Sequence, residues 1–397
     1  MMAACLRRCN RPMLMMQRFA KPSAVPALNR GDGIRSYAAA AAQLKPSPVY
    51  TEAPPRPQLP RSLPLSAAQV EHYFKEGYLI CPSFVDVAEL DDCLKAVEGL
   101  VDYVANRLYD TGRIKDKCES APVSTRLWLL EKQFKGASVL IHKAGVLPKE
   151  FQRVWSGQKL LDAVTQFIGG DIAGHPVWNL RSKTPHTEQA TVPWHQDNAY
   201  LDPECENTLQ VTAWIPLVDA NQTNGCIQVL RGGHRSGVTA KHTCCAGDTW
   251  YVQCDMNDME HTLGVNESDV VTCEMPRGGV LFMNNAIPHR STENLSEAIR
   301  WSLDLRWQDP AKPHGFHNLK DPVTMRLANQ PGYQMDWTTF AGIDRTKLQL
   351  EQASEEAQDY FETTIAGPWM ERWEITHPNR HTNALNAGGL TGWHSKA

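Results

Sequence analysis

Residues 300–307 alternate strictly between polar and apolar side chains, a period of two that predicts a β-strand. The apolar face consists of Trp301, Leu303, Leu305 and Trp307, and the polar face of Arg300, Ser302, Asp304 and Arg306. Burying charged side chains is costly unless they line a wet or ligand-filled cavity. The segment therefore predicts a strand that forms one wall of a binding site and turns its apolar face towards helices.

Short apolar segments continue this strand-like texture over the second half of the chain. From about Ile172 onwards they are separated by Gly, Asn, Asp and Pro, which is typical of an antiparallel sandwich or barrel. The expected strands cover residues 209–217, 226–230, 269–274, 280–283 and 299–307.

The part before Ile172 has helical spacing instead. Ser66 and Gln69 have the spacing of a capping box, which predicts a helix that ends near Gly77 and is followed by a short strand at 78–82. Longer helices are expected over 85–109 and 148–168. The fold class is thus α+β: a double-stranded β-helix core of the jelly-roll, cupin-like type, flanked by N-terminal helices.

The two ends of the chain differ from this central domain, which we place at residues 65–309. Residues 1–45 are rich in arginine and contain one acid, Asp32, a composition that predicts a mitochondrial transit peptide. The mature protein is then expected in the mitochondrial matrix, with a cytoplasmic location as the alternative. Residues 46–64 form a Pro-rich linker, and ordered structure is expected only after it. Residues 310–397 are interpreted as a C-terminal extension that packs on or caps the core.

Composition excludes some classes of partner. The net charge of −4 and the ordinary share of charged residues, 21%, give no indication of nucleic acid or a membrane surface as the main partner, and no apolar run is long enough for a membrane span. A small-molecule substrate is expected, and the oligomeric state is left open. The 11 cysteines show no regular framework, so we expect free thiols, including the adjacent Cys244 and Cys245.

Three residues form a candidate metal site. His195 and Asp197 lie two positions apart, and on an extended strand their side chains would point to the same face. His289 follows the strand expected at 280–283 and could face this pair. Two histidines and one carboxylate on one side of a metal leave positions open, which suits Fe(II) that binds a co-substrate and dioxygen. The alternative is an ordinary hydrogen-bonded His–Asp pair at a strand edge.

Two arginines on the polar face of the 300–307 strand are candidates for anion binding. The guanidinium of Arg300 can bind a dicarboxylate in bidentate fashion. Arg306 has two interpretations: it binds an anionic group of the substrate, or it pairs with Asp304.

Several of these segments together resemble the phytanoyl-CoA dioxygenase family of iron- and 2-oxoglutarate-dependent oxygenases. The resemblance covers residues 65–309 and rests on the opening helix and strand at 65–80, the segments 214–219 and 224–235, and the spacing of His289, Ser291 and Arg300. It implies that His195, Asp197 and His289 bind iron. It also implies a group of residues around the co-substrate 2-oxoglutarate: Arg300 on the distal carboxylate, with Ser291, Trp214, Lys143 and Asn179 nearby.

The implied reaction hydroxylates a small organic molecule or an acyl-CoA, consumes 2-oxoglutarate and O2, and releases succinate and CO2. Ascorbate is a candidate reductant. Asp197 favours hydroxylation, since halogenating relatives replace this carboxylate with a small residue. Two alternatives stay open: a catalytically silent binding protein, and a cupin-like metal dioxygenase that does not use 2-oxoglutarate.

Overall fold

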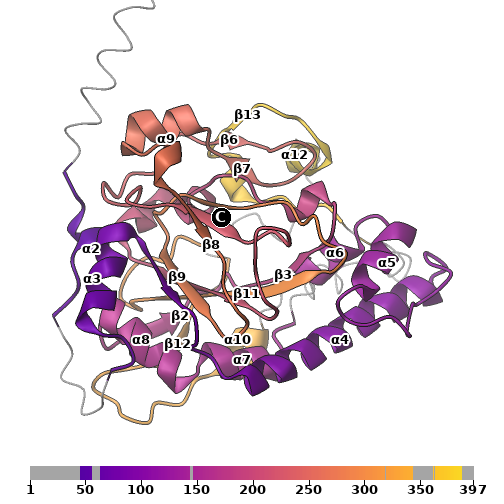
Figure 1. Cartoon of the computed structure of the whole chain (residues 1–397), viewed down its shortest axis with the longest axis horizontal. Coiled ribbons are helices and arrows are strands. Elements are labelled where there is room, and N and C mark those ends of the chain that lie inside the picture. Colours follow the sequence, from indigo (N-terminus) through magenta and orange to yellow (C-terminus); the bar gives the residue numbers. More distant parts are fainter. Residues whose placement is uncertain are drawn as a thin grey trace, which may run out of the picture.

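The computed structural model describes residues 45–55, 63–143, 146–317, 319–342, 361 and 363–386. The segment interpreted as a transit peptide lies outside the described residues except for Lys45. Two antiparallel sheets make up the centre of the molecule, with helices along one side and a small third sheet on the other (Figure 1).

The larger sheet has seven strands and carries the strand predicted at residues 299–307. This strand is β11 (Arg300–Gln308), and it pairs with β4 (Val211–Pro216) on one side and with β3 (Asn179–Lys183) and β2 (Ile172–Gly174) on the other. The remaining strands are β9 (Val280–Asn284) next to β4, β1 (Tyr78–Cys81) at one edge and β12 (Val323–Arg326) at the other.

The smaller sheet has three strands and faces the larger one. Its order is β10 (His289–Ser291), β5 (Ile227–Leu230) and β8 (Val270–Cys273). Trp214, Leu281 and Met283 of the larger sheet pack against Val229 and Cys273 of the smaller one in a single buried cluster. A core enclosed between two antiparallel sheets is the jelly-roll architecture, so the predicted fold class is confirmed.

Helices cover the outer face of the larger sheet. Trp301, Leu303, Leu305 and Trp307 belong to the same buried cluster as the helical apolar side chains, as the alternation of residues 300–307 predicted. The helices between residues 67 and 168 are α3 (Ala67–Glu76), α4 (Val87–Asp110), α5 (Arg126–Gln133), α6 (Ala137–Lys143), α7 (Lys149–Trp155) and α8 (Gln158–Ile168).

The capping box at Ser66 and Gln69 is present, and Gly77 ends α3 in the left-handed conformation, at φ 88°. The single helix expected over 148–168 is wrong, because α7 and α8 are separated at Gly157. The backbone there is extended, with ψ 131°, and glycine has a low helix propensity. Helices α5 and α6 were not predicted.

Ordered structure begins earlier than residue 65. The short helix α2 (Pro48–Thr51) carries Tyr50, whose side chain is fully buried. Its hydroxyl donates to the Glu206 carbonyl at 2.8 Å and accepts from the Asn285 amide at 3.1 Å. The expectation that ordered structure starts only after residue 64 is thus wrong for residues 48–51, because one tyrosine supplies both burial and hydrogen bonds.

The C-terminal part packs on the core. Strand β12 extends the larger sheet beyond Asp309, and β13 (Glu374–Ile375) joins β6 (Thr243–Cys244) and β7 (Val252–Gln253) in the third sheet. The other described elements after Asp309 are α10 (Trp337–Gly342), the 3-10 helix η6 (Pro368–Met370) and α12 (Arg380–Asn386). Helix α12 and the earlier helix α9 (Met256–Leu263) lie near the third sheet in Figure 1.

None of the described helices has both the length and the apolar character needed to cross a membrane. The expectation of free thiols is wrong for Cys244 and Cys245, which form a disulfide inside a buried cluster. The other described cysteines are free.

Candidate metal centre

His195 and His289 are brought together by a β-bridge between the two segments that carry them. Their backbones exchange two hydrogen bonds, N–H to O, of 3.0 and 2.9 Å, and their ring centroids are 4.2 Å apart. The expected strand around residues 195–197 is wrong, since His195 forms an isolated bridge and Asp197 starts the 3-10 helix η2 (Asp197–Tyr200). Gln196 between them is extended, so side chains two residues apart still converge.

Backbone carbonyl groups fix the orientation of both imidazoles. Nδ1 of His195 lies 2.8 Å from the Pro193 oxygen, and Nδ1 of His289 lies 3.1 Å from the Ile287 oxygen. Because a carbonyl oxygen only accepts, Nδ1 carries the hydrogen and Nε2 keeps its lone pair. Burial also lowers the pKa of His289 to about 4, which keeps this ring neutral at neutral pH.

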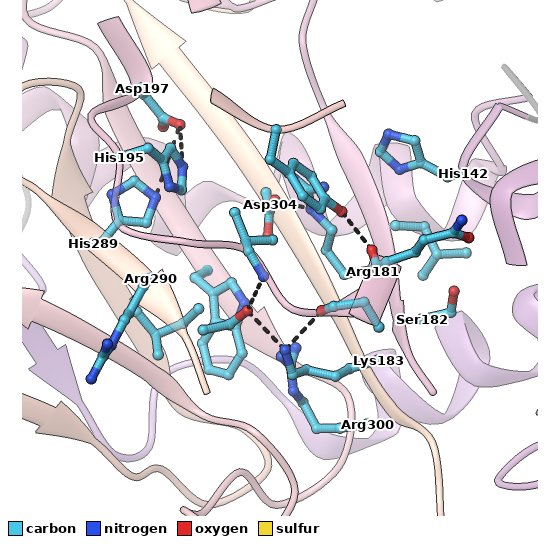
Figure 2. A pocket seen from close by; sticks show the side chains of 18 of the residues that line it. His142, Arg181, Ser182, Lys183, His195, Asp197, His289, Arg290, Arg300 and Asp304 are labelled. Atoms are coloured by element: carbon cyan, nitrogen blue, oxygen red, sulfur yellow. Dashed lines mark hydrogen bonds and ion pairs between the residues drawn. The ribbon is translucent and has the colours of Figure 1, made fainter. Parts of the chain in front are cut away.

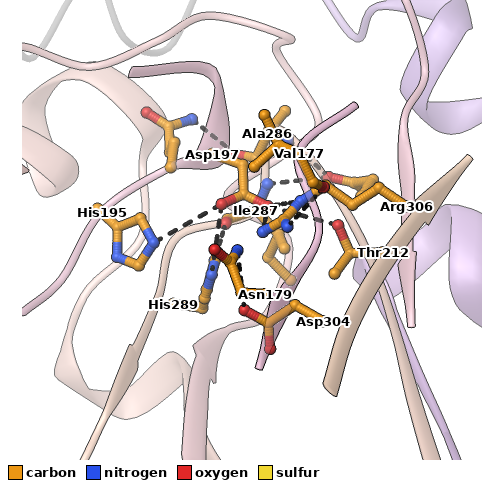
Figure 3. A network of polar contacts seen from close by, with 12 residues as sticks. Val177, Asn179, His195, Asp197, Thr212, Ala286, Ile287, His289, Asp304 and Arg306 are labelled. Carbon is orange, nitrogen blue, oxygen red and sulfur yellow. Dashed lines mark hydrogen bonds and ion pairs between the residues drawn. The ribbon is translucent and has the colours of Figure 1, made fainter. Parts of the chain in front are cut away.

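Asp197 offers one carboxylate oxygen to the same point. Its Oδ1 lies 3.8 Å from Nε2 of His195 and 3.9 Å from Nε2 of His289 (Figure 3). The ligand atoms of the three residues all lie within 4.8 Å of one another. Two imidazole nitrogens and one carboxylate oxygen on one side are the donor set suited to non-haem Fe(II), so the residues present fit this metal.

The second oxygen of Asp197 is held by Arg306. Oδ2 accepts from Nη2 at 3.0 Å and from Nε at 3.2 Å, and the Thr212 hydroxyl lies 3.4 Å away. Burial alone would raise the pKa of Asp197, but the Arg306 guanidinium and the two imidazoles hold it well below its usual range. Arg306 thus pairs with the candidate iron ligand, whereas the carboxylate of Asp304 accepts from Arg181 at 2.8 Å.

Gln196 was not recognised in the sequence, although it fixes the backbone between the two ligands. Its amide nitrogen donates to the carbonyls of Ala286, at 2.6 Å, and Val238, at 3.0 Å, and its amide oxygen accepts from Ala240 N at 2.8 Å. The side chain therefore ties the segment before η2 to two other loops. Its only sequence signal was a polar residue between two candidate ligands.

Replacing Arg306 with Gln is expected to weaken metal binding by about 10- to 100-fold, as is typical for the loss of an outer partner of a ligand. The carboxylate of Asp197 would lose the guanidinium that holds Oδ2 and leaves Oδ1 available. Titration of the metal-free protein with Co(II) or Fe(II) measures the change without any turnover. Arg306→Lys should recover part of the affinity, since it keeps the charge but not the two-pronged geometry. Unchanged affinity in Arg306→Gln would show that the ion pair does not position the ligand.

A pair of buried cations lies on another side of the same cavity. Arg300 and Lys183 are direct neighbours across β11 and β3, and both are almost fully buried (Figure 2). Arg300 donates to the Ser302 hydroxyl at 2.7 Å and to the Gly225 carbonyl at 2.9 Å, and its guanidinium lies 5.0 Å from the Trp214 ring centroid. Lys183 donates to the Ala190 carbonyl at 2.7 Å and the Ser291 hydroxyl at 2.9 Å.

These partners are all neutral. Burial lowers the pKa of Arg300 to about 10, and burial together with the Arg300 charge lowers that of Lys183 well below its usual value. The Nε of Arg300 is buried and has no hydrogen-bond partner among the described residues. Two adjacent buried cations with neutral partners favour binding of an anionic group between them.

Gly225 is required for this arrangement. Its φ is +82°, and a Cβ at this position would collide with the Lys183 side chain and the Thr292 carbonyl oxygen. Only glycine allows the backbone to approach this closely while its carbonyl accepts from Arg300.

The remaining predicted residues fall into two groups. Ser291 and Trp214 line the cavity together with the metal ligands and Arg300. Asn179 is not among the residues that line the cavity; its side-chain amide lies beside the Asp304 carboxylate and close to the guanidinium groups of Arg181 and Arg306. Lys143 is not one of the residues that line the cavity. It donates to the Thr364 carbonyl at 2.8 Å in the C-terminal segment.

Lys183 and Arg181 were missed, as was His142 on α6, which also lines the cavity. The signal was present in β3, where Asn179, Arg181 and Lys183 alternate with Leu180 and Ser182 shortly before the metal-binding segment. Because β3 pairs in register with β11, Arg181 and Lys183 line the same cavity as Arg300 and Asp304.

Comparison with known proteins shows to which family the chain belongs. Residues 73–302, more than half of the chain, match the family described as phytanoyl-CoA dioxygenase (PhyH). The chain belongs to the phytanoyl-CoA dioxygenase family. A phytanoyl-CoA dioxygenase of Arabidopsis thaliana is 30% identical over 260 residues, which cover 61% of this chain and 88% of that protein. A phytanoyl-CoA dioxygenase domain-containing protein 1 homolog of Dictyostelium discoideum is 20% identical, over 61% of this chain and 91% of that protein.

Solved structures also resemble the chain. The apo form of the non-heme monooxygenase ThoJ matches with a TM-score of 0.48 and 16% identity, and the match covers 72% of this chain and 96% of the ThoJ chain. Membership of the phytanoyl-CoA dioxygenase family, together with the His-Asp-His cluster, confirms the predicted reaction class. The protein is an iron- and 2-oxoglutarate-dependent dioxygenase.

Proposed function

We propose that this dioxygenase hydroxylates a small organic molecule at a centre formed by His195, Asp197 and His289, with 2-oxoglutarate bound at Arg300. One observation carries the proposal. A single cavity is lined by the three metal-ligating side chains and by a buried cation pair that has only neutral partners. The first group suits Fe(II), and the second suits the distal carboxylate of a dicarboxylic co-substrate.

Arg300 binds that carboxylate, and its neighbours orient it. The Arg300 guanidinium carbon lies over the Trp214 ring, while Ser302 and Gly225 accept hydrogen bonds from its terminal nitrogens. Lys183 supplies a second positive charge. The hydroxyl of Ser291 joins this group, since it accepts from Lys183 and from Val192 N at 3.0 Å.

Around the metal position, the chain holds the ligand atoms in a fixed orientation. The carbonyls of Pro193 and Ile287 direct Nε2 of each histidine, and Arg306 keeps Asp197 ionised with one free oxygen. When bound, iron and 2-oxoglutarate supply the oxidant from O2, with release of succinate and CO2. The carboxylate of Asp197 occupies the place that halogenating relatives leave open, which supports hydroxylation.

The test uses purified protein supplied with Fe(II), 2-oxoglutarate and ascorbate. Anaerobic addition of 2-oxoglutarate to the iron-loaded protein should produce a visible charge-transfer band, and exposure to O2 should release succinate. Absence of the band together with absence of succinate would contradict the proposal and favour a silent binding protein. Dioxygen consumption without 2-oxoglutarate would favour the cupin-like alternative.

We further propose that the protein acts in the mitochondrial matrix after removal of the segment around residues 1–45. The support is the composition of that segment, which has many arginines and one acid. Import of the full chain into isolated mitochondria, followed by shortening at the N-terminus, tests this location. Retention in the cytoplasmic fraction at full length would contradict it.

A further inference from the structure

The lining of the metal cavity is strongly unbalanced in charge. Five cationic side chains line it against two carboxylates, those of Asp197 and Asp304. The cations are Arg181, Lys183, Arg290, Arg300 and Arg306. His142 also lines the cavity, but burial lowers its pKa to about 3, so it stays neutral.

Metal and co-substrate do not remove this imbalance. Fe(II) brings two positive charges and 2-oxoglutarate brings two negative ones, so together they leave the sum unchanged. The excess stays positive even when Lys183 is counted as neutral. A buried cavity of this kind favours an additional anion, because uncompensated charge in a low-dielectric site is costly.

Three of the four arginines are already engaged. Arg306 holds Asp197, and Arg300 faces the place proposed for the co-substrate carboxylate. Arg290 donates to Gln228 at 2.8 Å and lies 4.7 Å from the Trp194 ring centroid. These contacts assign each of the three a task that does not involve the substrate.

Arg181 is the remaining arginine, and it is accessible. Asp304 accepts its Nε–H, and the Tyr251 side chain and the Asn179 amide also contact the guanidinium, so part of the five N–H donors remains available on the terminal nitrogens. The side chain is 26% exposed, compared with 8% for Arg306. In Figure 2 Arg181 and His142 lie across the cavity from the metal ligands.

An uncharged wall lies next to this arginine. Trp250 and Tyr251 line the cavity with ring centroids 4.8 Å apart, and His142 stacks on Trp250 at 5.8 Å. Val139 and Leu180 add aliphatic surface. The chain therefore places a partly exposed guanidinium beside an aromatic and aliphatic surface, a combination that fits a molecule with one anionic group and an apolar body.

We propose that the substrate is a small organic carboxylate whose carboxylate binds Arg181 and whose apolar body lies against Trp250 and Tyr251. This inference rests on the proposed function and narrows it. Free acids, not their CoA thioesters, are then the substrate class, because the thioester has lost the carboxylate that Arg181 would recognise.

The experiment compares matched probes on the complete enzyme. The iron- and 2-oxoglutarate-loaded protein is titrated without O2, with 3-phenylpropanoate, 3-phenylpropanamide and 3-phenylpropanoyl-CoA, and with octanoate and octanamide. Perturbation of the charge-transfer band reports binding, and succinate release after admission of O2 reports coupled turnover. At least one carboxylate is expected to bind about tenfold or more tightly than its amide, as expected for a charge-assisted hydrogen bond.

Variants distinguish a specific effect of Arg181 on carboxylate binding from an effect of the overall charge of the cavity. Arg181→Gln should remove the preference for carboxylate over amide, and Arg181→Lys should retain part of it. The double variant Arg181→Gln/Asp304→Asn removes the ion pair without changing the net charge or leaving Asp304 unpaired, and it should also lose the preference. Arg290→Gln removes one positive charge elsewhere in the lining, and the preference should persist.

Formation of the charge-transfer band distinguishes failure of the proposed function from failure of the proposed substrate class. Its absence in the wild-type protein contradicts the proposed function itself. If the band forms, three results would each overturn the present inference: no carboxylate binds, the amides or the CoA thioester bind as tightly, or the carboxylate preference survives in both variants that contain Arg181→Gln.

Discussion

Replacing Asp197 with Ala is expected to abolish coupled succinate formation and to reduce Fe(II) affinity strongly. The loss of affinity should exceed the change of about 10- to 100-fold that is typical when a residue that orients a metal ligand is removed. The substitution removes the sole carboxylate ligand of the cluster and leaves the buried Arg306 without its partner. Removal of one member of a buried ion pair typically costs about 3–5 kcal/mol in the free energy of unfolding. Metal titration and denaturant unfolding of the metal-free protein measure the two effects separately.

A second variant distinguishes loss of the ligand from loss of stability. Asp197→Ala/Arg306→Met also removes the unpaired guanidinium, so stability should recover while metal affinity stays low. Thr212→Val leaves the carboxylate and its ion pair in place and removes a single long contact of 3.4 Å. It should bind metal much as the wild-type protein does. Wild-type metal affinity in Asp197→Ala would contradict the assignment of this ligand.

Replacing Arg300 with Ala is expected to weaken 2-oxoglutarate binding by about 30-fold or more, because truncating one partner of a buried charge pair costs about 2–5 kcal/mol. Iron should be retained, since Arg300 does not contact any of the three metal-ligating side chains by a hydrogen bond or ion pair in the described part of the chain. Anaerobic titration with 2-oxoglutarate, followed by the charge-transfer band, measures the affinity directly.

The two neighbouring cations can be compared by substitution. Lys183→Met keeps Arg300 and its contacts to Ser302, Gly225 and Trp214, so we expect a smaller loss of 2-oxoglutarate affinity than in Arg300→Ala. Arg300→Lys should lie between Arg300→Ala and the wild-type protein, because an ammonium group cannot form the two-pronged contact. If 2-oxoglutarate affinity were the same in all of these variants, the assignment of Arg300 and Lys183 to the co-substrate carboxylate would be wrong.

Periodicity predicted the parts of the fold in which each strand has one clearly apolar face. The 300–307 segment is the plainest case, because its tryptophans and leucines all pack towards the helices. The metal ligands were also predictable, since His195 and Asp197 converge through local spacing and His289 follows a buried strand. The regular strand expected around His195 was wrong, but one extended residue, Gln196, was sufficient for the same convergence.

Pairings between distant segments were not predictable from spacing. Arg306 has Asp304 two residues away on the same face, yet its partner is Asp197 from another segment, which requires knowledge of the three-dimensional arrangement. Lys183 was not predicted, because its place in the site depends on the register between its strand and the strand of Arg300. Tyr50 gave no periodic signal at all, as a single aromatic residue in a Pro-rich segment.

The turn that follows Asp197 is held by both ends of the chain. Tyr50 contacts the Asn198 amide at 3.4 Å. From the C-terminal side, Arg372 donates to the Asn198 and Leu201 carbonyls at 2.8 Å each, and Trp373 donates to the Ala199 carbonyl at 2.8 Å. All three holding residues lie outside the region 73–302 that matches the family. We therefore expect the smallest fragment with an intact metal centre to be longer than the region that matches the family, and proteolytic trimming at either end to affect the iron site from a distance.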